Sequence, residues 1–68
     1  MDKELLFYEM AKKHKTVDEV CNEIGVSKSA FYRKLSGKSQ FTLNEIKCIV
    51  KVLQLKSPMA IFFAEEVS

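Results

Sequence analysis

Residues 16–53 read TVDEVCNEIGVSKSAFYRKLSGKSQFTLNEIKCIVKVL, and this stretch decides the fold because signals that start and stop helices follow one another closely in it. Its first four residues, TVDE, form a capping box. The hydroxyl of Thr16 can accept a hydrogen bond from the Glu19 amide while the Glu19 carboxylate reaches back to the Thr16 amide. Gly25 stands where a helix typically ends in a left-handed residue. These signals predict a helix that starts after Thr16 and ends before Gly25.

A second helix is predicted almost immediately afterwards. Only Gly25 and Val26 separate the first of these helices from Ser27, a typical N-cap residue, and Gly37 provides the next stop signal. We therefore expect a helix over residues 28–36. Two helices joined by so short a connection cannot pack side by side, so we predict a steep angle between them. The side chain of Val26 in the turn is expected to point inward and pack between the helices.

Three further helices are expected outside this pair. Apolar spacing predicts one over about residues 2–13, and a second capping box at residues 42–45 opens another, with Phe41 placed as a hydrophobic staple. Ser57 followed by Pro58 predicts the start of a short fifth helix. Strand signals are missing, so we predict an all-α fold of five short helices in one domain over residues 1–68. Its core is expected to contain Leu6, Met10, Val20, Ile24, Val26, Phe31, Leu35, Leu43, Ile46, Val50 and Leu53.

The length and composition narrow the class of protein. The chain has 68 residues, 47% of them hydrophobic and 29% charged, which is enough for one small core and is typical of a globular domain. No window approaches the roughly 18 apolar residues of a membrane span. The N-terminus carries acids at Asp2 and Glu4 where a signal peptide would be basic. We therefore expect a soluble cytoplasmic protein with no membrane partner.

The sequence has too few cysteine and histidine residues for a zinc site or a disulfide scaffold. Cys21 and Cys48 lie far apart without a CxxC motif, and His14 is the single histidine. We expect both thiols to be reduced and buried, because free cysteine behaves as a small hydrophobic residue. His14 is expected at the surface, close to the C-terminal end of the first helix. No cofactor and no small-molecule ligand are predicted.

The positive charge is concentrated in one block. The formal net charge is only +2, yet residues 26–40 contain four basic residues and no acid: Lys28, Arg33, Lys34 and Lys38. At helical spacing, one face of the helix over residues 28–36 gathers Lys28, Ser29, Tyr32, Arg33 and Ser36. Such side chains hydrogen-bond to base edges and phosphates. By composition alone, a solvated helix face is the simpler interpretation.

The tight turn before this helix strengthens the functional interpretation. Residues 16–53 resemble the lambda-repressor-like helix-turn-helix regulators of the Cro and cI type, the XRE family, and the segment GVSKSAFYRKLSGK is especially typical. The resemblance implies a five-helix DNA-binding domain whose third helix reads DNA. Less specifically, residues 41–67 look like small phage or prophage regulators of Gram-positive bacteria, which implies a bacterial or phage-infected host cell. The base-reading positions carried over are Lys28, Ser29, Tyr32 and Arg33.

Two positions depart from the family pattern. Many members carry a glutamine at the first turn of helix two, where it contacts phosphate, and Val17 stands there in this chain. A backbone clamp by that side chain is therefore in doubt. Cys21 replaces a more usual alanine.

We therefore expect sequence-specific binding of double-stranded DNA by a small transcriptional regulator. One monomer offers few base contacts, so a homodimer on a pseudo-palindromic operator is expected. Candidate dimer contacts are Ile61, Phe62 and Phe63, within an apolar surplus that includes Met59 and Val67; these residues could equally close the core under the first helix. Candidate phosphate contacts are Thr16, Lys34, Ser36, Lys38, Ser39 and Gln40.

The same residues allow two other classes of function to be compared with DNA binding. A protein-interaction module of the same fold, antirepressor-like or antitoxin-like, would bind a protein partner, and exposed Phe62 and Phe63 or acids beside the basic face would favour it. An enzyme is a poor hypothesis, because His14 has no sequence partner and no phosphate loop or paired carboxylates are visible.

Overall fold

The computed structural model describes residues 1–63, and all of its regular structure is helical. No strand occurs within these residues, which confirms the all-α prediction and the five expected helices. The predicted limits of 2–13 and 28–36 are each longer than the observed helices by one residue at one or both ends. In chain order the elements are α1 (Lys3–Lys12), α2 (Val17–Ile24), α3 (Lys28–Leu35), α4 (Leu43–Leu53) and α5 (Pro58–Phe62).

The two capping boxes form as predicted. The Thr16 hydroxyl oxygen accepts from the Glu19 amide at 3.1 Å, and Glu19 Oε1 accepts from the Thr16 amide at 2.9 Å. Thr42 and Glu45 repeat this arrangement with the same two distances. Ser27 caps α3 by accepting from the Ala30 amide at 3.1 Å. Local sequence therefore fixes where α2, α3 and α4 begin.

The helix ends follow the prediction less uniformly. Gly25 ends α2 in the left-handed region, with φ of 76°, and its amide donates to the Cys21 carbonyl. Gln54 ends α4 with φ of 52°, at a position where no glycine marks the stop. Ser57 stands at the N-cap of α5 but its side chain makes no capping hydrogen bond, so Pro58 at the first helical position is the operative start signal.

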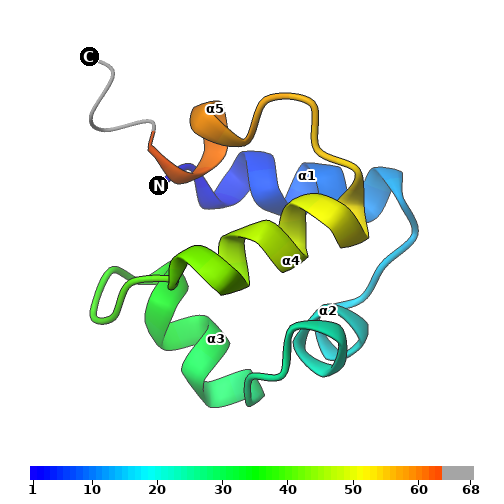
Figure 1. The fold of residues 1–68 in the computed structure, drawn as a ribbon. Coiled ribbons are helices and arrows are strands. Elements are labelled where there is room, and N and C mark those ends of the chain that lie inside the picture. The colour runs from blue at the N-terminus through cyan, green and yellow to red at the C-terminus, as the bar shows by residue number, and fades with distance from the viewer. Residues whose placement is uncertain (64–68) are drawn as a thin grey trace.

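The core lies where α4 passes between the other helices. Figure 1 shows α2 and α3 at one end of the molecule, α1 and α5 at the other, and α4 between them. The termini of the described chain meet, because the Asp2 amide donates to the Ile61 carbonyl at 2.7 Å. The largest fully buried side chains come from all five helices: Phe31, Leu6, Ile49, Leu53, Ile61 and Val20.

The burial predictions are correct for most core positions and wrong for two residues of α4. Leu43 is 65% exposed, because at 100° per residue it lies about 120° around the helix from Ile49, which is fully buried. Cys48 is exposed for the same reason, one position away from Ile49. Among the predicted core residues, those found buried are Leu6, Met10, Val20, Phe31, Leu35 and Leu53, and those found half-buried are Ile24, Val26, Ile46 and Val50.

The other cysteine and the histidine lie as expected. Cys21 is buried, and both its burial and the nearby Asp18 carboxylate raise the pKa of its thiol. It is therefore held in the unreactive thiol form. His14 is exposed just after α1, with φ of 57°.

Aromatic rings join α3 to α5 through the loop before α4. The Phe31 and Phe41 ring centroids are 5.8 Å apart, as are those of Phe41 and Phe62, and both pairs meet edge to face. Edge-to-face contact is a favoured geometry for aromatic side chains. Phe41 therefore links the core residue of α3 to α5.

One ion pair joins the last turn of α3 to the first turn of α4. Lys34 Nζ lies 2.9 Å from Glu45 Oε1, and the side chains are only 14% and 17% exposed. Partial burial alone would raise the pKa of the Glu45 carboxyl, but the hydrogen bonds from Lys34 and from the Thr42 amide outweigh it and lower that pKa. Glu45 is thus held ionised in the folded protein.

We predict that replacing Phe31 with alanine lowers the free energy of unfolding by about 3 to 5 kcal/mol, because it empties the centre of the core and breaks the aromatic contacts. Urea denaturation followed by circular dichroism measures this loss. The matched control is Leu43→Ala, which removes an exposed apolar side chain and should change the same quantity by less than about 0.5 kcal/mol. Similar losses in the two variants would contradict the observed core.

Stability is also predicted to fall in acid. The lowered pKa of the Glu45 carboxyl contributes stability that is fully present above the ordinary carboxyl pKa of about 4.3 and is lost as the pH falls through the lower folded-state value. Glu45→Gln keeps a cap acceptor but carries no charge, so its free energy of unfolding should decline less on acidification than that of the unaltered protein. Urea titrations over a pH series measure both slopes; identical slopes would show that the Glu45 charge adds no stability.

Candidate nucleic-acid interface

The outward face of α3 carries the four residues predicted to read bases. Lys28, Ser29, Tyr32 and Arg33 are all exposed, while Phe31 and Leu35 on the opposite face are buried. The helix therefore has an anchored side and a free polar side. We call its free side, formed by Lys28, Ser29, Tyr32 and Arg33, the α3 arc.

Of the two cations in the α3 arc, Arg33 is the one without an ion-pair partner among the described residues. No carboxylate within residues 1–63 pairs with its guanidinium. Lys28, by contrast, lies with its Nζ 3.2 Å from Asp18 Oδ1, and both side chains are more than half exposed. Exposed pairs of this kind are weak and exchange readily with water or another anion. An acidic group nevertheless flanks the N-terminal end of the arc.

Tyr32 presents its phenol beside Arg33. Its ring meets the buried Phe31 edge to face, with centroids 6.0 Å apart, while the side chain stays exposed. This contact orients the ring while nearly half of the residue stays exposed. The α3 arc thus offers a guanidinium, a phenol and the Ser29 hydroxyl to solvent.

Lys34, one of the predicted phosphate contacts, is paired with a carboxylate in the structure. Its ammonium is directed into the junction with α4, where it bonds to Glu45 and donates to the Gln40 carbonyl at 3.3 Å. It also lies 5.8 Å from the centroid of the Phe41 ring. The sequence placed this cation on the flank of the helix, but a carboxylate eleven positions away draws it inward.

The remaining predicted phosphate contacts lie around the end of α3, except for Thr16. Lys38 is exposed, and its amide donates to the Arg33 carbonyl at 3.1 Å, which joins the loop to the last turn of α3. Ser36 is exposed and donates its hydroxyl hydrogen to the same carbonyl at 2.9 Å. Gln40 is exposed and Ser39 half-buried. The amide of Thr16 is committed to its capping box, which leaves the hydroxyl hydrogen as its donor.

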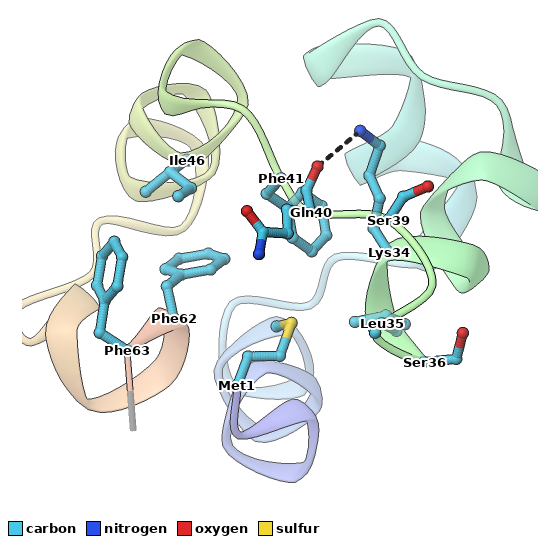
Figure 2. Close-up of a pocket in the computed structure, with 11 residues that line it drawn as sticks. Met1, Lys34, Leu35, Ser36, Ser39, Gln40, Phe41, Ile46, Phe62 and Phe63 are labelled. Carbon is cyan, nitrogen blue, oxygen red and sulfur yellow. Dashed lines mark hydrogen bonds between the residues drawn. The ribbon is translucent and has the colours of Figure 1, made fainter. Parts of the chain in front are cut away.

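A hollow opens behind this loop, between the end of α3 and α5. Figure 2 shows Phe62 and Phe63 on one side of it and Leu35 and Ser36 on the other, with Met1 below. The cavity volume is about 300 Å³. It is lined by both apolar and polar side chains, Lys34 among them.

The three candidate dimer residues have different environments. Ile61 is buried, so it closes the core under α1 and offers no surface to a partner. Phe62 and Phe63 are half-buried at the hollow, whereas Met59 is exposed. Val67 lies outside the described residues. The predicted dimer contact is thereby reduced to Phe62 and Phe63.

Neither a membrane helix nor a metal site appears in the part of the chain that the structure describes. None of its helices has the length and apolar composition needed to cross a bilayer. Nor do three or more His, Cys, Asp or Glu side chains come together in residues 1–63 in a way that could hold a metal ion.

Comparison with known proteins identifies one family. The model of the BetR domain matches residues 2–67, which is nearly the whole chain. No curated protein and no solved structure matches significantly. The match covers all five helices and the α3 arc. The chain therefore belongs to the BetR domain family.

Proposed function

We propose that the protein binds double-stranded DNA at specific sequences and regulates transcription, with α2 and α3 acting as a helix-turn-helix and α3 entering the major groove. The observation that carries this proposal is the α3 arc. It exposes a hydroxyl, a phenol and a guanidinium that pairs with no carboxylate of residues 1–63, on a helix that contains no acid and whose opposite face is anchored by Phe31 and Leu35. The resemblance to lambda-repressor-like regulators supports the same assignment.

The side chains of the arc have the chemistry needed to distinguish base pairs. The guanidinium of Arg33 can donate two parallel hydrogen bonds to O6 and N7 of guanine. The Ser29 hydroxyl both donates and accepts, and the Tyr32 ring can contact a thymine methyl group while its hydroxyl donates. Lys28 can join these contacts once a phosphate or a base replaces the exposed Asp18 as its partner.

Contacts with the DNA backbone are assigned to the loop that follows α3. Lys38 and Gln40 are exposed there, and Ser36 lies at the end of the helix. The first turn of α2 contributes less, because Val17 cannot hydrogen-bond and the carboxylates of Asp18 and Glu19 repel a phosphate at that helix end. Lys38 is the residue of this loop that carries a positive charge, and it adds to the cations Lys28 and Arg33 of the α3 arc.

Two copies on a pseudo-palindromic site would supply the affinity that one eight-residue helix lacks. The interface proposed for such a homodimer includes Phe62 and Phe63. These side chains are half-buried at the end of the molecule where α5 meets α1. An interface there would leave the α3 arc free for DNA.

A second candidate function is recognition of a protein partner by the same fold. It is favoured by the Asp18 carboxylate that flanks the α3 arc, and by Tyr8 and Met59, two large side chains that are mostly exposed. Such a module would lack the dependence on salt that phosphate contacts create. Salt dependence therefore separates the two candidates.

We predict that Arg33→Ala and Lys38→Ala weaken DNA binding in different ways. For a duplex that the unaltered protein selects from a random library, Arg33→Ala should weaken binding by about 1 to 3 kcal/mol and affect random duplex much less. Lys38→Ala should weaken both duplexes alike and reduce the slope of log affinity against log salt by about one. Fluorescence anisotropy at several salt concentrations measures both quantities.

Two outcomes would contradict this assignment. Equal losses on both duplexes for Arg33→Ala would remove Arg33 from the base-reading set. Absence of binding by the unaltered protein to any duplex at low salt would exclude DNA binding and favour the protein-partner candidate.

A further inference from the structure

We propose that Lys34 and Glu45 are positioning residues, which set the direction in which α3 presents its arc and thereby control sequence discrimination without touching DNA. This inference rests on the proposed function and adds to it a pair of side chains outside the α3 arc. The pair joins the C-terminal end of α3 to the N-terminal end of α4.

A single carboxylate oxygen connects the two helices. Glu45 Oε1 accepts from Lys34 Nζ at 2.9 Å and from the Thr42 amide at 2.9 Å. The ion pair and the capping box of α4 therefore share one atom, and a shift of the Lys34 ammonium would also disturb the start of α4. The same ammonium donates to the Gln40 carbonyl, as the dashed line in Figure 2 shows.

The pair differs from the other ion pairs of the described residues in its burial. Its side chains are 14% and 17% exposed, compared with 57% and 70% for Lys28 and Asp18. Partly buried charges are screened less by salt than exposed ones. The ion pair between Lys34 and Glu45 can therefore hold a fixed geometry. The exposed pair between Lys28 and Asp18 can instead exchange its partners for water or another anion.

Two tertiary contacts hold the C-terminal end of α3: the buried side chain of Leu35 and this ion pair. Its N-terminal end is held by the short turn and by the Ser27 cap. At the other end the chain passes through Gly37, whose φ is 89°, into a loop that reaches α4 only at Thr42. Lys34 is the neighbour of Arg33 in the same turn, so a change in its anchorage moves the guanidinium. Contacts with base edges tolerate displacements of only about 0.5 Å.

Two variants separate positioning from direct contact. Lys34→Met keeps an unbranched side chain but removes the charge, and Glu45→Gln keeps the cap acceptor but removes the charge. By electrostatics alone, the loss of the Glu45 negative charge should strengthen binding to every duplex. Positioning requires the opposite result on the selected duplex, so the sign of the change is informative. Glu9→Gln is the matched control, because Glu9 pairs with Lys12 inside α1.

The experiment measures affinity for the selected duplex and for random duplex over a salt series. We expect Lys34→Met and Glu45→Gln each to weaken binding to the selected duplex by about tenfold, with random duplex far less affected and the salt slope unchanged. The double variant should lose no more than either single variant, because the two residues act as one unit. Glu9→Gln should keep the unaltered preference.

Other outcomes overturn the inference. A salt slope reduced by about one in Lys34→Met, with both duplexes weakened alike, would make Lys34 a phosphate contact. Unchanged or tighter binding of Glu45→Gln to the selected duplex would show that the pair positions nothing. If Lys34→Met fails to fold, Lys34→Arg replaces it: this variant keeps the cation and should keep the preference, and a lost preference in that folded variant would contradict the inference.

Amide hydrogen exchange in the free protein distinguishes failure of the positioning role from failure of the proposed DNA binding. Loss of the ion pair should accelerate exchange at residues 32–38 more than in α1. Unchanged exchange there would contradict the positioning role even if the unaltered protein binds DNA. If the unaltered protein binds no duplex while exchange is accelerated, the anchorage of α3 is real and the assignment to DNA fails.

Discussion

The burial of Phe31 is the constraint on which the rest of the structure depends. A helix of eight residues has little stability of its own, so α3 exists because its inner face packs into the core. Phe31 is fully buried and meets Phe41 edge to face, and Phe41 in turn meets Phe62. This contact fixes which side of α3 faces inward, and it therefore also decides which side chains form the α3 arc.

The two ends of α3 are held by different kinds of interaction. At its N-terminus the constraint is local, because Gly25 turns the chain and Ser27 caps the helix within three residues. At its C-terminus the constraint is tertiary, because Leu35 is buried in the core and Lys34 reaches Glu45 across the loop. The arc between these ends carries the Arg33 guanidinium, which no carboxylate in the described part of the chain pairs with. A rigid support beneath a free polar surface is the arrangement that recognition of a base edge requires.

The local features of this fold were predictable from the sequence, and its long-range features were not. Capping boxes and the Ser27 cap act within three residues, so they located the starts of α2, α3 and α4 correctly. The apolar residues of α4 occupy a wider arc than the core covers, so periodicity could not show that Leu43 points outward. Helical spacing placed Lys34 at the surface. Its partner Glu45 lies eleven positions away, so no local pattern could show that the two side chains pair. For the α3 arc, helical spacing was sufficient to predict that all four residues are exposed. The contact between Asp18 and Lys28 could not be predicted in this way, because it depends on how the turn places α2 against α3.

We propose that the α3 arc is the surface that meets double-stranded DNA. The most direct measurement is an NMR titration of the isotope-labelled protein with the selected duplex at low salt. We predict that the largest amide shifts fall on residues 27–40 and that the side-chain Nε signal of Arg33 moves with them. Shifts centred instead on Tyr8 and Met59, or no shifts at all, would contradict it.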